Sequence, residues 1–225
     1  MIIAGFVKNS FVDYPGKIAS TIFTAGCNMR CWYCHNSHIL ENFENKVEED
    51  FILNFLKERK GFIDAVVISG GEPTLQKDLK EFIKKIKVLG YLIKLDTNGS
   101  NYEVLKSLID ENLLDYVAMD IKAPLNKYSK ITNTKIDIDN IKKSIELLIE
   151  NKVDYEFRTT FSPDLTLEDI EEICASLKGA KNYVIQKYNV VEYNKINMPL
   201  RKKEDHIKAK NIALKYINNV ILKGI

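Results

Sequence analysis

Three of the four cysteines lie in one short stretch, residues 23–36, with the sequence FTAGCNMRCWYCHN. Cys27, Cys31 and Cys34 have the spacing C-x3-C-x2-C. Thiolates this close together can converge on one metal centre, and an odd number cannot all pair as disulfides. Soft thiolate ligands select zinc, copper(I) or iron–sulfur clusters. Because ordinary four-iron clusters take four cysteines, three would leave one iron open to another ligand.

Two plainer interpretations compete with an open iron–sulfur cluster. A structural zinc ion needs four closed ligands, and His35 or His38 is near enough in sequence to be the fourth. The cysteines could also be a chance group in a reduced protein. The cysteine loop alone leaves all three interpretations open.

The residues around the cysteines resemble a known family. The cysteine spacing, with the aromatic Tyr33 before the last cysteine, is similar to the cluster loop of the radical S-adenosylmethionine (SAM) superfamily. Residues 11–36, FVDYPGKIASTIFTAGCNMRCWYCHN, resemble the start of the glycyl-radical-enzyme activating proteins. Within that group they look most like the activating proteins of anaerobic ribonucleoside-triphosphate reductase. The resemblance runs from about Gly5 to Asn189.

This resemblance implies one [4Fe-4S] cluster on Cys27, Cys31 and Cys34, with SAM bound at the open iron. An electron from the cluster would split SAM into methionine and a 5′-deoxyadenosyl radical, which takes a hydrogen atom from a glycine of a partner enzyme. A flavodoxin or ferredoxin-type protein would supply the electron. A second cluster is not expected, because too few cysteines remain for a ferredoxin-like module.

Alternating strands and helices must position these residues. Apolar and β-branched runs predict strands over residues 2–7, 18–23, 65–69, 91–95, 116–119, 155–161 and 183–188. Helical spacing of apolar residues predicts helices over 48–59, 78–89, 102–110, 139–151, 167–177 and 202–222. Such alternation indicates right-handed crossovers and a parallel sheet.

We therefore predict an α/β fold, a partial (β/α)6 barrel of the radical SAM type with parallel strands and outer helices. A flavodoxin-like open sheet is the alternative. The 225 residues fit one domain, residues 1–225, with the cluster loop at 24–36 and a final helix at about 202–222. Polar motifs follow strand after strand, so they should share the rim at the carboxyl ends of the strands, where ligands bind.

The first rim motif is Gly70-Gly71-Glu72-Pro73. Glycines are needed where the backbone comes close to a ligand or adopts positive φ, although an ordinary turn between strand and helix would also use them. The matching segment of radical SAM enzymes binds the amino group of SAM. The resemblance thus assigns Gly70, Gly71 and Glu72 to SAM.

Asp96 and Asp120 end two successive predicted strands and are followed by Thr97 and Lys122. Two carboxylates and a lysine on one rim suit a cationic or zwitterionic ligand, although Asp is also a common helix cap. In the activating proteins these positions lie beside the SAM carboxylate, and the aspartates can help to hold a small cation. The resemblance implies the same for Asp96, Thr97, Asp120 and Lys122.

Arg158 lies on an otherwise apolar strand, two residues after Glu156 and on the same face. An internal ion pair between the two is one interpretation. The resemblance offers another, contact with the carboxylate or ribose of SAM. Gln186 and Lys187, on the last predicted strand, are weaker candidates of the same kind, and Tyr33 could stack near the adenine.

Two other residues with reactive side chains are not expected in the site. Cys174 has helical spacing from Ile170 and Leu177, so we expect it to be a small buried hydrophobe. His206 is expected on the surface of the final helix, whose Lys-rich stretch is one candidate docking surface.

Composition narrows the function classes. A net charge of +2 favours neither nucleic acid nor an anionic membrane as a partner. No signal peptide or membrane span is evident, and free thiols fit the reducing cytoplasm. Three functions remain: an activating enzyme for anaerobic ribonucleotide reductase, another radical SAM enzyme acting on a small molecule or on a pyruvate formate-lyase type partner, and a zinc-stabilised binding module without activity.

Overall fold

The computed structural model describes residues 1–41, 46–190 and 198–225. One eight-stranded sheet forms its centre, with the strands in chain order. The strands are β1 (Ile3–Ser10), β2 (Ala19–Thr24), β3 (Ala65–Gly70), β4 (Leu92–Thr97), β5 (Tyr116–Asp120), β6 (Asp154–Phe161), β7 (Asn182–Lys187) and β8 (Asn219–Lys223). β1 pairs antiparallel with β2, and all later neighbours are parallel.

The predicted fold class is confirmed. Six parallel strands, β2 to β7, follow one another with helical crossovers, and β1 and β8 extend the sheet at its two edges. The two edge strands do not pair with each other, so the described sheet does not close into a barrel. The consecutive strand order excludes the flavodoxin-like alternative, which requires a reordered sheet.

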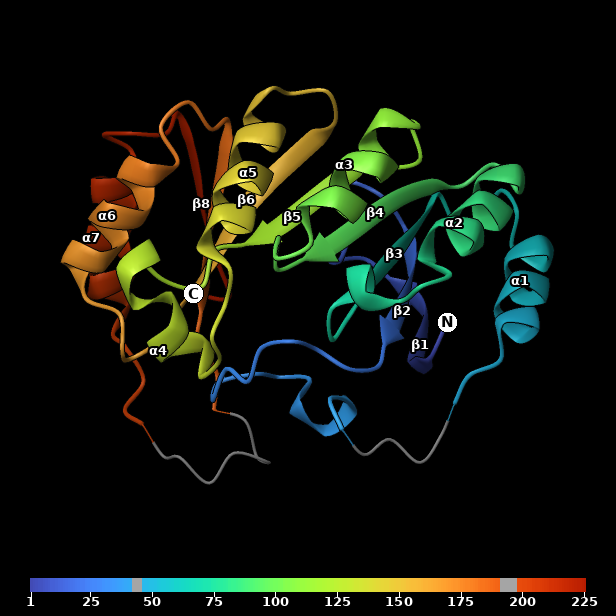
Figure 1. Ribbon diagram of the computed structural model, residues 1–225, viewed down its shortest axis with the longest axis horizontal. Coiled ribbons are helices and arrows are strands. Elements are labelled where there is room, and N and C mark those ends of the chain that lie inside the picture. Colours follow the sequence, from blue (N-terminus) through green and yellow to red (C-terminus); the bar gives the residue numbers. More distant parts are fainter. Residues whose placement is uncertain (42–45, 191–197) are drawn as a thin grey trace.

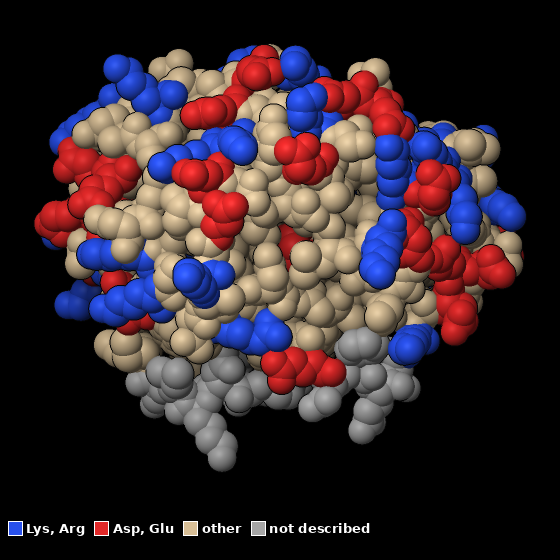
Figure 2. Space-filling model, in the orientation of Figure 1, with Lys and Arg blue, Asp and Glu red and all other residues tan. Residues whose placement is uncertain are grey.

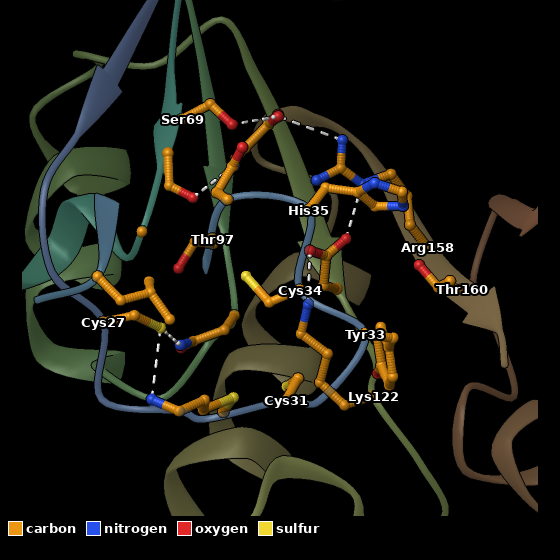
Figure 3. A pocket seen from close by; sticks show the side chains of 18 of the residues that line it. Cys27, Cys31, Tyr33, Cys34, His35, Ser69, Thr97, Lys122, Arg158 and Thr160 are labelled. Carbon is orange, nitrogen blue, oxygen red and sulfur yellow. Dashed lines mark hydrogen bonds and ion pairs between the residues drawn. The ribbon is translucent and has the colours of Figure 1, made fainter. Parts of the chain in front are cut away.

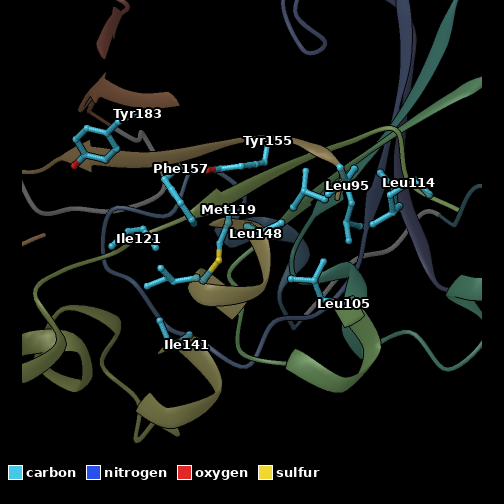
Figure 4. Packing of buried hydrophobic residues seen from close by; sticks show 14 of the residues in the cluster. Leu95, Leu105, Leu114, Met119, Ile121, Ile141, Leu148, Tyr155, Phe157 and Tyr183 are labelled. Atoms are coloured by element: carbon cyan, nitrogen blue, oxygen red, sulfur yellow. The ribbon is translucent and has the colours of Figure 1, made fainter. Parts of the chain in front are cut away.

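Helices cover the outer face of the sheet. They are α1 (Glu49–Glu58), α2 (Leu79–Val88), α3 (Tyr102–Asp110), α4 (Tyr128–Thr132), α5 (Ile138–Ile149), α6 (Leu167–Ser176) and α7 (Lys203–Ala213). Figure 1 shows them in a row, from α1 at one side to α6 and α7 at the other. Their apolar faces pack on outward-facing strand residues, among them Leu95, Met119 and Phe157 (Figure 4). The main core therefore lies between sheet and helices.

The inner face of the sheet carries the polar side chains. On β6 the burial alternates strictly: Tyr155, Phe157 and Phe161 are buried under the helices, whereas Glu156 and Arg158 on the opposite face are partly accessible. This alternation follows from the two-residue period of a strand. It places the functional side chains of each strand on the concave side.

The C-terminal segment corrects one expectation. The predicted helix at about 202–222 ends at Ala213, and residues Asn219–Lys223 form β8 instead. Turn residues follow the helix end, and the β-branched and apolar run Val220, Ile221 and Leu222 pairs in parallel with β7. A free edge of the sheet offered this pairing, and no local pattern revealed it.

The molecular surface has mixed charge. In Figure 2 lysine and arginine side chains are interspersed with aspartate and glutamate over the visible face. Among the described residues, no helix has the length and apolar character that crossing a membrane requires.

Candidate functional site

One pocket lies at the carboxyl ends of the parallel strands, between the strands and the cysteine loop (Figure 3). It brings together every residue that the sequence assigned to the site except Glu72: Cys27, Cys31, Tyr33, Cys34, Gly70, Gly71, Asp96, Thr97, Asp120, Lys122 and Arg158. Residues from five separate segments thus meet in one place, as expected when strand ends share a rim.

The three loop cysteines are free thiols, partly buried and facing this pocket. Cys27 Sγ accepts a hydrogen bond from the backbone N–H of Met29 at 3.3 Å. Burial raises the pKa of Cys27 to about 11 and also raises the pKa values of Cys31 and Cys34. A bound metal centre would reverse this effect because metal ligation deprotonates thiols. The site therefore fits a cationic centre with thiolate ligands.

A close backbone approach holds the cysteine loop in place. Gly71 N–H donates to Thr24 O at 2.8 Å, and Glu72 N–H donates to Gly26 O at 2.8 Å. A Cβ atom on Gly71 would lie 1.8 Å from Gly26 O. Gly70 has φ +112°, a conformation that L side chains rarely adopt. The two glycines are thus needed for contact with the cysteine loop itself.

The Glu72 side chain turns away from the pocket. It is fully buried, and its Oε1 accepts from Thr74 Oγ1 at 2.6 Å and from Thr97 Oγ1 at 2.8 Å. Its Oε2 accepts from the Asn98 backbone N–H at 2.7 Å. Burial raises the pKa of Glu72, and these donors oppose that rise. Glu72 therefore ties the turn after β3 to the turn after β4.

Five charged side chains form a connected network on the inner face of the sheet. Arg158 Nε donates to Asp120 Oδ1 at 2.8 Å, and Arg158 Nη1 lies 3.3 Å from Asp96 Oδ2. Lys94 Nζ lies 2.5 Å from Asp96 Oδ1, and Lys122 Nζ lies 2.9 Å from Asp120 Oδ2. Three cations thus surround two carboxylates. Counted over these five side chains there is one positive charge in excess, which can attract an anionic group of a ligand, although the charge of Glu156 on the same face also acts on Arg158.

Electrostatics keeps this network ionised. Burial is the largest single influence and would raise the pKa values of the two carboxyl groups, but Arg158 together with Lys122 at Asp120, and Arg158 together with Lys94 at Asp96, outweighs it. The pKa of Asp120 falls to about 2, and that of Asp96 also falls below its usual value. Both groups are therefore carboxylates at neutral pH.

The pairing of Arg158 differs from one sequence interpretation. Glu156 does not hold Arg158; its Oε2 accepts from the Tyr116 hydroxyl at 3.2 Å. Asp120 and Arg158 are direct cross-strand partners, which explains their contact. The register of β5 against β6 determines which residue pairs with Arg158, and spacing within β6 alone could not predict it.

Among the described residues, no three His, Cys, Asp or Glu side chains are placed to hold a single metal ion.

Aromatic and imidazole side chains border the cysteines. Tyr33 lines the pocket and is buried, and its ring meets Trp32 edge to face with centroids 5.6 Å apart. The Tyr33 hydroxyl has no hydrogen-bond partner within the described chain. A buried orphan hydroxyl at a pocket wall is what a site built around a further group would leave. His35 lines the same pocket, whereas His38 does not.

The structure adds lining residues that the sequence did not assign: Asn36, Ser69, Asn98 and Thr160. Ser69 Oγ donates to Asp96 Oδ2 at 3.0 Å, and Asn36 Nδ2 donates to Gly70 O at 2.9 Å. Ser69, Asn98 and Thr160 lie at or next to strand ends and Asn36 follows the last loop cysteine, so their position beside the assigned motifs was the signal that could have identified them. Of the two weaker candidates, Gln186 lines the pocket and Lys187 does not.

The two remaining reactive side chains lie elsewhere. Cys174 is fully buried in α6 within the hydrophobic core, as predicted. His206 is also buried, at 1% exposure, so the expectation of a surface histidine is wrong. Its ring packs edge to face on Phe161, and Nδ1 contacts Lys202 O at 3.0 Å. Packing of α7 on the sheet buries it.

Comparison with known proteins identifies relatives over the whole chain. The family model described as the radical SAM superfamily matches residues 21–177. Two proteins of Methanocaldococcus jannaschii, each named "Putative glycyl-radical enzyme activating enzyme", are similar to this chain. One is 40% identical, covering 100% of this chain and 96% of its own. The other is 35% identical, covering 94% and 82%.

Solved structures share the fold at low sequence identity. Streptococcus suis SuiB bound to S-adenosylmethionine superposes with a TM-score of 0.69 at 16% identity, covering 88% of this chain. The chain spans about half of SuiB, 48% of its length. A domain of pyruvate-formate lyase-activating enzyme from Bacteroides vulgatus has a TM-score of 0.59 at 16% identity, and the match covers 72% of this chain and 99% of that domain.

Proposed function

The chain belongs to the radical SAM superfamily, whose members are enzymes that use a [4Fe-4S] cluster and SAM, and we propose that it activates a glycyl-radical enzyme. The observation that carries this proposal is the single pocket that joins three cysteine thiols to a charged network at the strand ends. The M. jannaschii relatives support the choice of reaction by their names. The alternative of a zinc-stabilised binding module without activity is rejected, because the chain belongs to a superfamily of enzymes.

In this proposal Cys27, Cys31 and Cys34 hold one [4Fe-4S] cluster, and all three line the pocket as free thiols. When bound, the cluster and SAM supply the electron and the 5′-deoxyadenosyl group that removes a hydrogen atom. The protein binds both, excludes water and oxygen, and fixes their orientation. Glu72 serves by positioning the Thr97–Asn98 turn, because its carboxylate is turned inward.

The SAM methionyl group binds beside the charged network. Its carboxylate is the anion that the network lacks, and Arg158 and Lys122 are the lining cations that pair with it. The aspartates Asp96 and Asp120 hold those cations in place. Gly70, Gly71 and Thr97 line the same wall, where the Thr97 hydroxyl bonds to Glu72, and Tyr33 borders the cysteine side.

We expect Arg158→Met to weaken SAM binding by on the order of tenfold or more, because hydrogen bonds to charged groups contribute about 1.5–3 kcal/mol. Iron content should not change, because the Arg158 guanidinium bonds to Asp120 and Asp96 and not to the cysteines. Lys94→Met is the matched control: it also removes a cation from Asp96, but Lys94 does not line the pocket. The measurement that tests this prediction is the equilibrium affinity of each reconstituted protein for SAM. Equal affinity in Arg158→Met and wild type would remove Arg158 from the SAM site.

The partner we propose is anaerobic ribonucleotide reductase, with a flavodoxin or ferredoxin-type reductant, in the cytoplasm. The resemblance of residues 11–36 supports this choice of partner. The described sheet is open in its hydrogen bonding, since β1 and β8 do not pair, and an open sheet is compatible with access for a peptide loop, because a glycine buried in a partner must reach the pocket. Its Cα must come within roughly 3–3.5 Å of the attacking carbon. Activation of a pyruvate formate-lyase type enzyme is the second candidate.

The test is electron paramagnetic resonance of reconstituted protein, SAM, reductant and a candidate partner under anaerobic conditions. With anaerobic ribonucleotide reductase we expect a persistent glycine-centred doublet, and only slow SAM cleavage without a partner. A doublet with a pyruvate formate-lyase type enzyme instead would keep the reaction and change the partner. Turnover of a small molecule with no doublet from either enzyme would reject activation as the function.

A further inference from the structure

One cysteine ligand receives a side-chain hydrogen bond from outside the cysteine loop. Asn98 Nδ2 lies 3.8 Å from Cys27 Sγ, in addition to the backbone N–H of Met29 at 3.3 Å. Both contacts are drawn as dashed lines to Cys27 in Figure 3. Asn98 follows β4 directly, and the last two residues of β4 are Asp96 and Thr97 of the proposed SAM site. The contact therefore joins the two halves of the pocket.

The orientation of the Asn98 amide is fixed by its neighbours. Asn98 Oδ1 accepts from the Ser100 backbone N–H at 2.9 Å and from Ser100 Oγ at 2.6 Å. A backbone N–H can only donate, so the oxygen must face Ser100 and the NH2 group must face the other way. One of its hydrogens goes to Asn28 Oδ1 at 2.9 Å, which leaves the second for Cys27 Sγ.

Hydrogen bonds also fix the position of the Asn98 backbone. Its N–H donates to the buried carboxylate of Glu72 at 2.7 Å, and the neighbouring Thr97 hydroxyl donates to the same carboxylate at 2.8 Å. The Asn98 residue itself is only 5% exposed. With backbone and side chain both anchored, the donor cannot swing to water. The N–H···S contact is thus a built feature of the site.

We propose that Asn98 raises the reduction potential of the cluster held by Cys27, by donating a hydrogen bond to its thiolate. The inference rests on the proposed cluster site. Reduction adds negative charge to an iron–sulfur cluster, and N–H donors to its sulfurs stabilise that charge, so hydrogen bonds to sulfur are a determinant of the potential. Asn98 is a positioning and tuning residue: it touches a metal ligand and leaves the number of ligands unchanged.

The test compares the reduction potentials of reconstituted variants without SAM, by redox titration followed by electron paramagnetic resonance. Asn98→Ala removes the donor, and Asn98→Asp replaces it with an acceptor while keeping an oxygen for Ser100. We expect both potentials to shift to more negative values, Asn98→Asp further because it adds a negative charge, with iron content unchanged. Ser100→Ala is the control: it removes the hydroxyl that bonds to Asn98 Oδ1 and Asn28 Nδ2, whereas the Ser100 backbone N–H still orients Asn98. Its potential should stay close to that of wild type, because the Asn98 donor remains.

A second measurement separates hydrogen bonding from a general effect of polarity. Electron–nuclear double resonance of the reduced cluster in deuterated water should detect an exchangeable deuteron that Asn98→Ala loses and Ser100→Ala keeps. Wild-type potentials in both Asn98 variants would overturn the proposal. So would loss of the cluster in both, because Asn98 would then hold the site together. A potential shift with no glycyl radical formed would reject the proposed reaction and leave the role of Asn98 standing.

Discussion

Replacing Cys27, Cys31 or Cys34 by alanine is expected to abolish the cluster and, with it, SAM cleavage. The three thiols line one pocket, so each variant removes a ligand that no other thiol in the pocket can replace. Wild-type protein reconstituted under anaerobic conditions should hold about four irons with sulfide per chain, as one four-iron cluster requires. Each variant should fall well below that value, and 5′-deoxyadenosine should drop to the background of reductant alone.

Cys174→Ala is the matched control for these variants. Cys174 is fully buried in α6, beside Ile170 and Ile173 in the hydrophobic core, and does not line the pocket. Its loss should cost on the order of 1 kcal/mol, because a single buried sulfur is removed from a packed core. Iron content and cleavage should stay at wild-type values. Cluster loss in Cys174→Ala with retention in Cys31→Ala would contradict the ligand assignment.

Gly71→Ala is expected to have an effect nearly as large, through the cysteine loop. The new Cβ would lie 1.8 Å from Gly26 O and 2.6 Å from Gly26 C, both backbone atoms. Relief requires one of two turns to move, although they are joined by the Glu72 N–H to Gly26 O hydrogen bond. We expect destabilisation of about 3 kcal/mol or more, and a fall in Tm of about 6–12 °C for a domain of this size.

The same substitution at Gly5 provides a control. A Cβ there would lie 3.7 Å from the Phe23 side chain, an ordinary contact distance. Thermal unfolding of the metal-free proteins and iron content after reconstitution separate the two variants. Gly71→Ala should unfold at lower temperature and hold less iron than Gly5→Ala. Equal values would mean that the turn after β3 does not brace the cysteine loop.

The sequence predicts the parallel fold because its signals are local. The buried run of β3 and the helical apolar spacing of α2 need no tertiary information, and both elements appear close to their predicted bounds. The strand β8 is missed because pairing with the free edge of β7 outweighs the helical pattern before it. His206 is missed for a related reason: packing of α7 on Phe161 decides its burial.

The candidate site shows the same difference between what local sequence signals predict and what tertiary packing determines. Position at a strand end is sufficient to predict that Asp96, Asp120 and Lys122 share a pocket. It does not reveal that Arg158 bridges the two carboxylates, because that contact depends on the register of β5 against β6. The inward turn of Glu72 likewise depends on which donors the neighbouring turn offers. Motifs locate residues, whereas side-chain partners come from three-dimensional packing.

Transfer of deuterium from the partner enzyme tests the central claim most directly. Anaerobic ribonucleotide reductase labelled with deuterium at its glycine α carbons is incubated with the reconstituted protein, SAM and reductant, and the 5′-deoxyadenosine is analysed by mass spectrometry. If the 5′-deoxyadenosyl group removes a hydrogen atom from a partner glycine, a deuterium atom appears in 5′-deoxyadenosine as the glycyl radical forms. Unlabelled 5′-deoxyadenosine formed together with a glycyl radical would contradict direct abstraction from glycine.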